Sequence, residues 1–306
     1  MPHSLVSEIR GLPEEKISFK KHTYDKFLGR YTGIGEAKKP EAIQAIKIDL
    51  TRNIGKILVD LQDEIKFALD KEIGTCQAWT EIQVFPKVIQ IVALLSARAF
   101  VGLPLCRDKE WSDATINFTA GAVAVMNANS RIPQYLRSFV SPFLPELRKL
   151  GTYRDFAGKK MKPQVDAILS TYKEKVCSFK TLDDENSMSE AIEGNFNLVH
   201  WMIGHFKDPE KADAFELGGQ QMTAAFAAIH TTGMAATHAI FDLAAHPEYI
   251  SELRAEINAV MAEEPGTQLR KACIAKLKKL DSFIKESQRM SPPTMSGFSC
   301  LSCFYC

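Results

Sequence analysis

The residues with the clearest chemical potential are His230, Thr231 and Thr232, which stand within the alanine-rich run from Ala224 to Ala245. Threonine and histidine favour a helix less than the alanines around them. A threonine hydroxyl can also bond back to the carbonyl four residues earlier, here that of Ala227, and loosen the helix locally. The pattern predicts a bent helix beside a groove, with a hydroxyl and an imidazole placed to hold a ligand and transfer protons.

A second pair with chemical potential is Glu286 and Arg289, which are three residues apart on a later helical segment. At that spacing the two side chains are neighbours on one face of a helix. An exposed ion pair of this kind contributes about 0.3–0.5 kcal/mol. The rigid, planar guanidinium of arginine equally suits a buried network. The spacing alone leaves both interpretations open.

Cysteines are candidates for metal binding at the end of the sequence. Cys300, Cys303 and Cys306 have the spacing of a metal or iron–sulfur motif. No fourth ligand is visible, and terminal residues are usually the least ordered part of a chain. We therefore expect residues 299–306 to be an incidental cysteine-containing tail. The remaining cysteines are too sparse for a disulfide scaffold in 306 residues, which indicates a reducing compartment.

Composition excludes several classes of protein. A chain of 306 residues with 45% hydrophobic content can bury a large core in one or two domains. The net charge of +1 gives no global attraction to nucleic acid, and no basic stretch is interleaved with aromatic residues. Gly33-Ile-Gly35 lacks the third glycine of a dinucleotide loop, because Lys38 stands there. Nucleic acid and dinucleotides are therefore not expected as partners.

Membrane-targeting patterns are also missing from the expected places. Residues 1–16 are too charged for the apolar stretch of a signal peptide or an anchor. The alanine-rich run is interrupted by His230, His238 and Asp242, although a span needs about 20 apolar residues. We therefore expect a buried internal helix there and no transmembrane anchor.

The elements that position these residues are predicted to be almost entirely helices. Apolar residues recur every three or four positions in most of the chain, which is typical of helices with one buried face. The longest expected helix, over 212–245, would extend about 50 Å at about 1.5 Å per residue, and His246-Pro247 would end it. A sheet would be minor and lie in the first 40 residues. The other expected helices cover 44–71, 88–100, 111–126, 133–150, 165–176, 250–261 and 277–284.

Taken together, these features resemble the haem-thiolate monooxygenases, the cytochrome P450 family, of the fungal secondary-metabolism kind. The segment from Ala227 to Thr232 matches that family's small-small-x-acid-Thr-Thr/Ser motif, with His230 where an acid is more usual. The segment from Leu277 to Pro293 matches the family's Glu-x-x-Arg helix. The resemblance covers roughly residues 1–298. It implies a mainly α, cytochrome P450-like fold, incomplete at both ends, whose partial domain spans 1–298.

The resemblance also implies roles for the residues of the long helix. Thr231 would face dioxygen at the haem and organise its protonation. His230 would take the place of the acid in a proton relay, since its reference pKa of about 6.5 suits proton exchange near neutrality. Ala227 and Ala228 would leave room for haem and oxygen. Phe226 and Ile229 would line the substrate pocket.

Outside that helix, the resemblance implies structural and haem-binding roles. Glu286 and Arg289 would form a structural network in the core on the haem side. None of the three tryptophans has an arginine four residues later, as the family's haem-propionate motif requires. Arg52 or Lys56 would take over that contact.

One defining motif of the family is absent, the loop Phe-x-x-Gly-x-x-x-Cys-x-Gly that supplies the axial cysteine. No glycine scaffold surrounds Cys300, Cys303 or Cys306, so we assign no metal ligand. Without this segment we expect the Glu286–Arg289 network to be left uncompensated. An uncompensated buried charge costs about 3–5 kcal/mol, against a total stability of about 5–15 kcal/mol. The expectation is a truncated, destabilised chain that retains haem poorly.

The resemblance implies a monooxygenase that oxidises a small hydrophobic secondary metabolite, using dioxygen and electrons from an NADPH-dependent reductase. The family's place is the cytoplasmic face of the endoplasmic reticulum, and without an anchor this chain is expected in the cytoplasm. Truncation would impair the activity. Two alternatives stay open: a non-catalytic helical remnant or interaction protein from a truncated gene, and an ordinary helical protein in which His230 and Thr231 are satisfied core groups.

Overall fold

The computed structural model describes residues 12–13, 18–35, 40–179, 197–263 and 269–292. In these ranges the chain forms helices joined by turns and contains no strand. The predicted mainly α fold is therefore confirmed. The minor sheet expected in the first 40 residues does not form in the described part of that segment, which folds into two short helices. The cysteine-containing tail at 299–306 lies outside the described residues.

The helices follow the sequence periodicity closely in most of the chain. In the first half they are α2 (Phe19–Lys26), α3 (Gly29–Thr32), α4 (Pro40–Gln44), the π-helix η2 (Ala45–Leu50), α5 (Thr51–Glu72), α6 (Val84–Phe100), the 3₁₀ turn η3 (Leu105–Arg107) and α7 (Lys109–Ser130). In the second half they are η4 (Gln134–Leu136), α8 (Arg137–Val140), η5 (Ser141–Phe143), α9 (Pro145–Phe179), α11 (Leu198–Gly204), η6 (Pro209–Lys211), α12 (Ala214–Ala245), α13 (Glu248–Ala262), α14 (Lys271–Ile274) and α15 (Lys278–Met290).

The predicted helices over 133–150 and 165–176 are wrong in their boundaries. The first is divided into the short turns η4, α8 and η5, because three prolines fall in this stretch and each lacks the N–H that a helix interior needs. Pro145 then occupies the first position of α9, where proline is tolerated. α9 continues through Pro163, so the second predicted helix is the C-terminal half of one helix of 35 residues.

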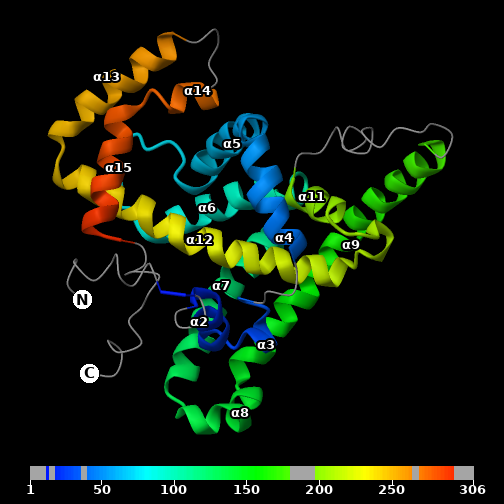
Figure 1. Ribbon diagram of the computed structural model, residues 1–306. Coiled ribbons are helices and arrows are strands. Elements are labelled where there is room, and N and C mark those ends of the chain that lie inside the picture. Colours follow the sequence, from blue (N-terminus) through cyan, green and yellow to red (C-terminus); the bar gives the residue numbers. More distant parts are fainter. Residues whose placement is uncertain (1–11, 14–17, 36–39, 180–196, 264–268, 293–306) are drawn as a thin grey trace.

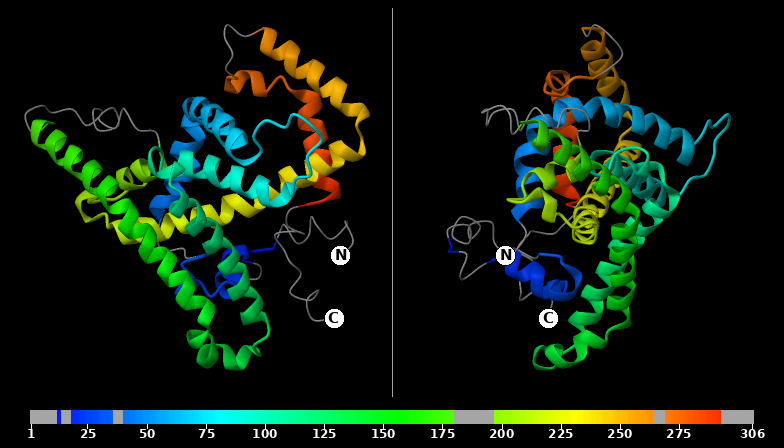
Figure 2. Two further views of the ribbon diagram at one scale, coloured as in Figure 1. Left: turned by 180° about the vertical axis from the view of Figure 1, so that it is seen from behind. Right: turned by 90° about the vertical axis from the view of Figure 1, so that its right-hand side faces the viewer.

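α12 lies at the centre of the molecule; it is buried all round over residues 217–222 and mainly along one side after that. Figure 1 shows it crossing the middle of the fold, with α9 running across it and α15 beside its C-terminal half; Figure 2 gives the same arrangement from behind. Residues one turn apart bury a continuous stripe against the neighbouring helices, as an amphipathic helix requires. This stripe consists of Leu217, Gln221, Ala225, Ile229, Gly233 and Thr237.

The crossing of α9 and α12 brings the two backbones into contact at glycines. A Cβ atom added at Gly218 would lie 2.6 Å from the backbone nitrogen of Gly158 and 2.9 Å from the carbonyl carbon of Ala157. Only a residue without a side chain fits this approach. The glycine pair therefore sets how closely α9 can pack against the central helix.

A buried carboxylate ties α5 to the segment after α6. Glu64 of α5 is fully buried, and its Oε2 lies 3.0 Å from Arg107 Nη2 in η3. The same guanidinium lies over the ring of Phe67, 4.1 Å from its centroid. Beside it, Cys106 is buried, and that burial raises the pKa of its thiol to about 11. This cluster is a structural ion pair with an unreactive, protonated thiol next to it.

Two hydrogen-bonded contacts attach the last described helices to the rest. Gln62 Nε2 donates to the Leu269 carbonyl at 2.9 Å, and the Leu269 amide donates to Gln62 Oε1 at 2.7 Å. Ser287 Oγ donates to Asp242 Oδ2 at 2.5 Å and so links α15 to α12. Among the helices that the structure describes, none combines the length and apolar character that crossing a lipid bilayer requires.

Candidate functional site

The central helix begins at a well-defined cap. Asp213 precedes its first residue, and Oδ2 of this side chain accepts a hydrogen bond from the Glu216 amide at 2.9 Å. Such a cap satisfies one of the free amides at the helix start, and the acidic residue in the first turn suits the helix dipole. The buried stripe then fixes the rotation of α12. That rotation decides which of residues 226–232 face the core and which face away.

Thr231 lies on the side of α12 that the described residues leave open. Its hydroxyl donates to the Ala227 carbonyl at 2.7 Å, which confirms the predicted bond back to the preceding turn. Thr231 and Ala227 are both exposed, and Ala228 is half-buried. Thr223 and Thr237 make the same kind of bond but are half-buried and buried. What distinguishes Thr231 is therefore its exposure and not its hydrogen bond.

His230 points away from this open face and toward α7. Its Nε2 lies 2.8 Å from the Thr119 hydroxyl, and Thr119 is fully buried. Burial lowers the pKa of the half-buried His230, so its imidazole is neutral near pH 7. Neighbouring residues of a helix lie about 100° apart around its axis. The structure accordingly holds the His230 and Thr231 side chains in two different environments.

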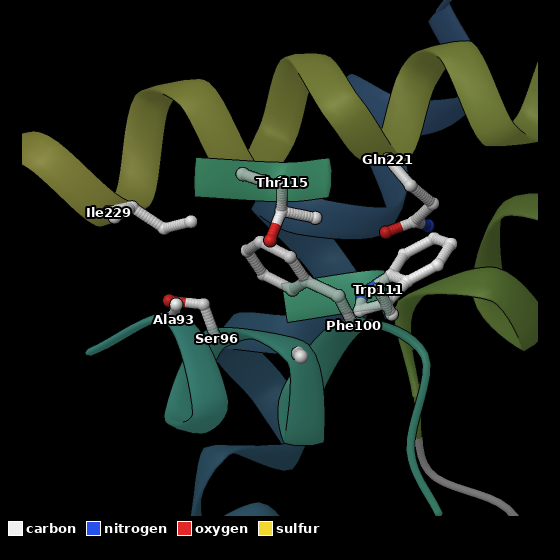
Figure 3. Close-up of a pocket in the computed structure, with 9 residues that line it drawn as sticks. Ala93, Ser96, Phe100, Trp111, Thr115, Gln221 and Ile229 are labelled. Atoms are coloured by element: carbon white, nitrogen blue, oxygen red, sulfur yellow. The ribbon is translucent and has the colours of Figure 1, made fainter. Parts of the chain in front are cut away.

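A small cavity lies between α6, α7 and α12, beside the buried stripe of the central helix. Its volume is only about 10 Å³, room for at most about one water molecule. Figure 3 shows the Gln221 side chain reaching into it from α12 between the rings of Phe100 and Trp111, with its oxygen on the side of Thr115. That oxygen is buried and has no hydrogen-bond partner within the described chain. The lining is completed by Ala93, Ser96, Ala97, Ala225 and Ile229.

The two residues predicted to line a substrate pocket do not lie beside Thr231. Ile229 is 1% exposed and faces the cavity, about 200° around the helix from Thr231. Phe226 packs against the main core, and its ring meets that of Phe27 edge-on at 5.0 Å. The structure thus brings Ala227 and Thr231 together on one face and places Phe226 and Ile229 elsewhere.

Glu286 and Arg289 form an ion pair on the surface of α15. Arg289 Nη2 lies 2.7 Å from Glu286 Oε1, and the two side chains are 66% and 61% exposed. The pair lowers the pKa of the Glu286 carboxyl. The expectation of an uncompensated buried charge is wrong for the described chain, because both groups are paired and hydrated. The proposed structural network of the two residues stays a prediction.

Arg52, the candidate for a haem-propionate contact, is exposed in the first turn of α5. That helix packs mainly against α6. The assignment therefore stays a prediction from the resemblance.

The described residues fit one side of a flat cofactor. Ala227 and Thr231 form an uncovered surface of small side chains, which a planar ring can approach closely. We assign no cysteine thiolate to the other side of such a cofactor. Cys106 is a buried, protonated thiol, Cys273 is buried on α14, and Cys76 is exposed between α5 and α6. Cys300, Cys303 and Cys306 lie outside the described residues.

Sequence reasoning missed Thr119 and Gln221 as parts of this region. Both are polar residues at buried positions of their helices, at 0% and 1% exposure. A polar residue in a core stripe was the available signal, because buried polar groups need partners. The partner itself could not be read from the sequence, since Thr119 and His230 are 111 residues apart.

Comparison with known proteins identifies the family of this chain. The family description "Cytochrome P450" matches residues 61–299. A cytochrome P450 monooxygenase of Acremonium egyptiacum, ascG, is 41% identical over 302 residues, which cover 96% of this chain and 54% of the relative. Another from Aspergillus terreus, ataF, is 36% identical over 297 residues, 97% of this chain and 56% of the relative. The chain thus spans about half the length of these curated relatives.

Solved structures agree at the level of the fold. The crystal structure of the cytochrome P450DA haem domain superposes with a TM-score of 0.57 at 12% identity, covering 88% of this chain and 55% of that one. A retinoic acid-bound cyanobacterial cytochrome P450 superposes with a TM-score of 0.52 at 14% identity, covering 91% of this chain and 50% of that one. With the family match over most of its length, this chain belongs to the cytochrome P450 family.

Proposed function

We propose that this chain forms the oxygen-activating helical part of a cytochrome P450 monooxygenase that oxidises a small hydrophobic secondary metabolite. Family membership supports the reaction class. The observation that carries the proposal is the uncovered face of α12, where the exposed Thr231 hydroxyl stands one turn from the exposed Ala227. A hydroxyl on a surface of small residues suits a site that must admit a flat cofactor and still supply a polar group.

The haem that this family carries supplies, when bound, the activation of dioxygen with electrons from an NADPH-dependent reductase. Ala227 and Ala228 leave space beside the ring because their side chains are single methyl groups. The Thr231 hydroxyl has one hydrogen, and it is donated to the Ala227 carbonyl. Its oxygen therefore presents only lone pairs to the open face. Thr231 acts there as a hydrogen-bond acceptor that orients a protonated donor.

His230 contributes a neutral imidazole on the adjoining side of α12, turned toward α7. Its lowered pKa keeps it unprotonated near neutrality, so it can take up a proton and release it again. The reductase, the hydrophobic substrate and the place at the cytoplasmic face of the endoplasmic reticulum follow from family membership alone and stay predictions.

The central test replaces Thr231 by alanine in a form of the protein extended to the length of its relatives. We expect Thr231→Ala to keep consuming dioxygen while product per dioxygen falls at least about tenfold. This is less than the roughly 10²–10⁴-fold that a positioned proton transfer contributes, because Thr231 orients the donor and does not itself transfer the proton. The matched control is Thr223→Ala, which loses an equivalent bond, to the Gly219 carbonyl, two turns away. Unchanged coupling in Thr231→Ala would refute the role of this hydroxyl.

A second test uses the chain of 306 residues itself and addresses the alternative of a remnant without cofactor. We expect added haemin to produce a visible absorption change that Ala227→Phe suppresses, because a phenyl ring fills the open face. Ala244→Phe, at another exposed alanine of α12, is expected to leave the titration unchanged. If both variants bound haemin like the wild type, the open face would not be the cofactor site.

A further inference from the structure

We infer that Thr119 is a positioning residue that fixes the proton of neutral His230 on Nε2, so that His230 exchanges protons with its surroundings only through Nδ1. The tautomer follows from contacts between α7 and α12. Its use in a proton relay rests on the proposed function.

The argument starts from the single hydrogen of the Thr119 hydroxyl. Oγ1 lies 2.6 Å from the Ile116 carbonyl oxygen in the same helix. A carbonyl oxygen can only accept, so the hydroxyl hydrogen is committed to this bond. Oγ1 also lies 2.8 Å from His230 Nε2. With its hydrogen already used, the hydroxyl can only accept here, and Nε2 must be the donor.

The opposite tautomer is disfavoured by the same distances. With the proton on Nδ1, a lone pair of Nε2 would face a lone pair of Thr119 Oγ1 across 2.8 Å. If the Thr119 hydrogen turned to Nε2 instead, Oγ1 and the Ile116 carbonyl oxygen would lie 2.6 Å apart without a hydrogen between them. Thr119 is fully buried, so water does not replace the lost bond. A buried donor or acceptor left unsatisfied is costly, and this favours the Nε2–H tautomer by roughly fivefold or more.

This arrangement closes one side of the imidazole to proton transfer. The path from Nε2 leads through the Thr119 hydroxyl to the Ile116 carbonyl, and a carbonyl has no proton to pass on. Nδ1 carries the free lone pair. When His230 takes up a proton, it enters at Nδ1 and gives an imidazolium whose Nε2–H bond to Thr119 is unchanged. The same proton leaves from Nδ1, which restores the neutral ring.

The experiment reads the tautomer directly by NMR on the whole chain, labelled with ¹⁵N in histidine. Spectra are recorded at about pH 8, well above the histidine reference pKa of about 6.5, and His230→Gln identifies the His230 signals. In the wild type we expect a protonated, pyrrole-like Nε2 and a pyridine-like Nδ1. Thr119→Val removes the acceptor at nearly constant volume, and both nitrogen signals are expected to move toward the averaged positions of a mixed tautomer. Thr119→Ser should restore the wild-type pattern.

The matched control is Thr115→Val, one turn earlier in α7. Thr115 is also buried, and its hydroxyl also bonds a carbonyl of its own helix, that of Ser112 at 2.9 Å. This variant loses a comparable bond, and its His230 signals are expected to stay in place. A wild-type His230 with its proton on Nδ1 would overturn the inference, even if Thr119→Val did not fold. So would unchanged signals in a folded Thr119→Val protein.

The outcome is independent of the proposed function. If Thr231→Ala left coupling intact while His230 showed the Nε2–H form, the monooxygenase role of Thr231 would fail and the tautomer would stand. If coupling fell but His230 carried its proton on Nδ1, the reverse would hold.

Discussion

At the scale of single residues, helix geometry gives His230 and Thr231 different surroundings although they are adjacent in sequence. His230 binds a buried hydroxyl on α7, whereas Thr231 keeps its hydrogen bond within α12 and stays exposed. The pKa of His230 therefore depends on its burial, whereas the surroundings of Thr231 depend on what binds to the open face. The two can be tested by different measurements.

Stability should depend on pH through His230. Burial lowers its pKa in the folded protein, so between the reference value of about 6.5 and the lower folded value the unfolded chain binds more protons. The free energy of unfolding therefore has the full His230 contribution above about pH 6.5 and loses it as pH falls toward the folded pKa. In urea unfolding over this window, His230→Gln should lose less stability than the wild type. Equal pH dependence of the two proteins would contradict the buried, neutral imidazole.

The sequence predicted contacts between residues a few positions apart in one helix, but not contacts between side chains of different helices. The bond from Thr231 to Ala227 follows from a spacing of four, and the structure has it. The Thr119 partner of His230 depends on how α7 and α12 pack, which local periodicity does not encode. Glu286 and Arg289 were predicted to be neighbours, and they are, but their spacing could not tell an exposed pair from a buried one.

At the scale of elements, the contact of α9 with α12 depends on glycine. The backbones meet at Gly158 and Gly218, where neither helix can yield by rotating a side chain. Helix propensity alone would favour alanine at such positions. Close packing therefore outweighs propensity at this crossing.

Gly218→Ala should destabilise the protein by about 1–3 kcal/mol, because the added methyl group overlaps the backbone of α9 and forces the helices apart. The control is Gly55→Ala in α5, where a Cβ meets nothing within 4 Å. That change should stabilise by about 0.5–1 kcal/mol through the better helix propensity of alanine. Urea unfolding of both variants measures the difference. Two changes of the same sign and size would show that the crossing is not close-packed.

Helix positions were predictable from apolar spacing, but helix ends near proline were not. The expected helix over 212–245 agrees with α12 to within two residues at its start and ends at the same residue. The segment from Pro133 to Pro145 was expected to be one helix and is several turns, whereas Pro163 was expected to lie between helices and is inside α9. A proline in the interior of a helix removes one helical hydrogen bond. Whether the helix continues depends on packing around it, which a single sequence does not give.

At the scale of the whole molecule, a few long-range contacts attach the last helices to the core. The Gln62 side chain makes two hydrogen bonds with the backbone of Leu269, 207 residues later. α13, α14 and α15 share a small apolar cluster around Val260, Cys273 and Leu277, and α15 also packs against α12, to which Ser287 and Asp242 join it. Gln62 therefore holds the segment before α14, whereas α15 is held by its contact with α12.

Gln62→Leu should loosen the segment before α14, because the two bonds to Leu269 contribute about 1–3 kcal/mol together. We expect trypsin to cleave after Arg270 or Lys271 roughly fivefold faster or more, since the cleavage rate follows the open population. Gln288→Leu, at an exposed position of α15, is the control and should leave the rate unchanged. Equal cleavage of both variants would show that another contact holds this segment.

The cavity beside α12 has a practical consequence for optical measurements. Trp111 lines it and is 2% exposed, and Trp201 is 7% exposed, whereas Trp79 is fully exposed. Iodide in solution therefore quenches the fluorescence of Trp79 and spares the two interior indoles. The emission that survives the quencher comes from Trp111 on α7 and Trp201 on α11, and it reports how tightly the helices around these two indoles stay packed, without any label attached to the chain.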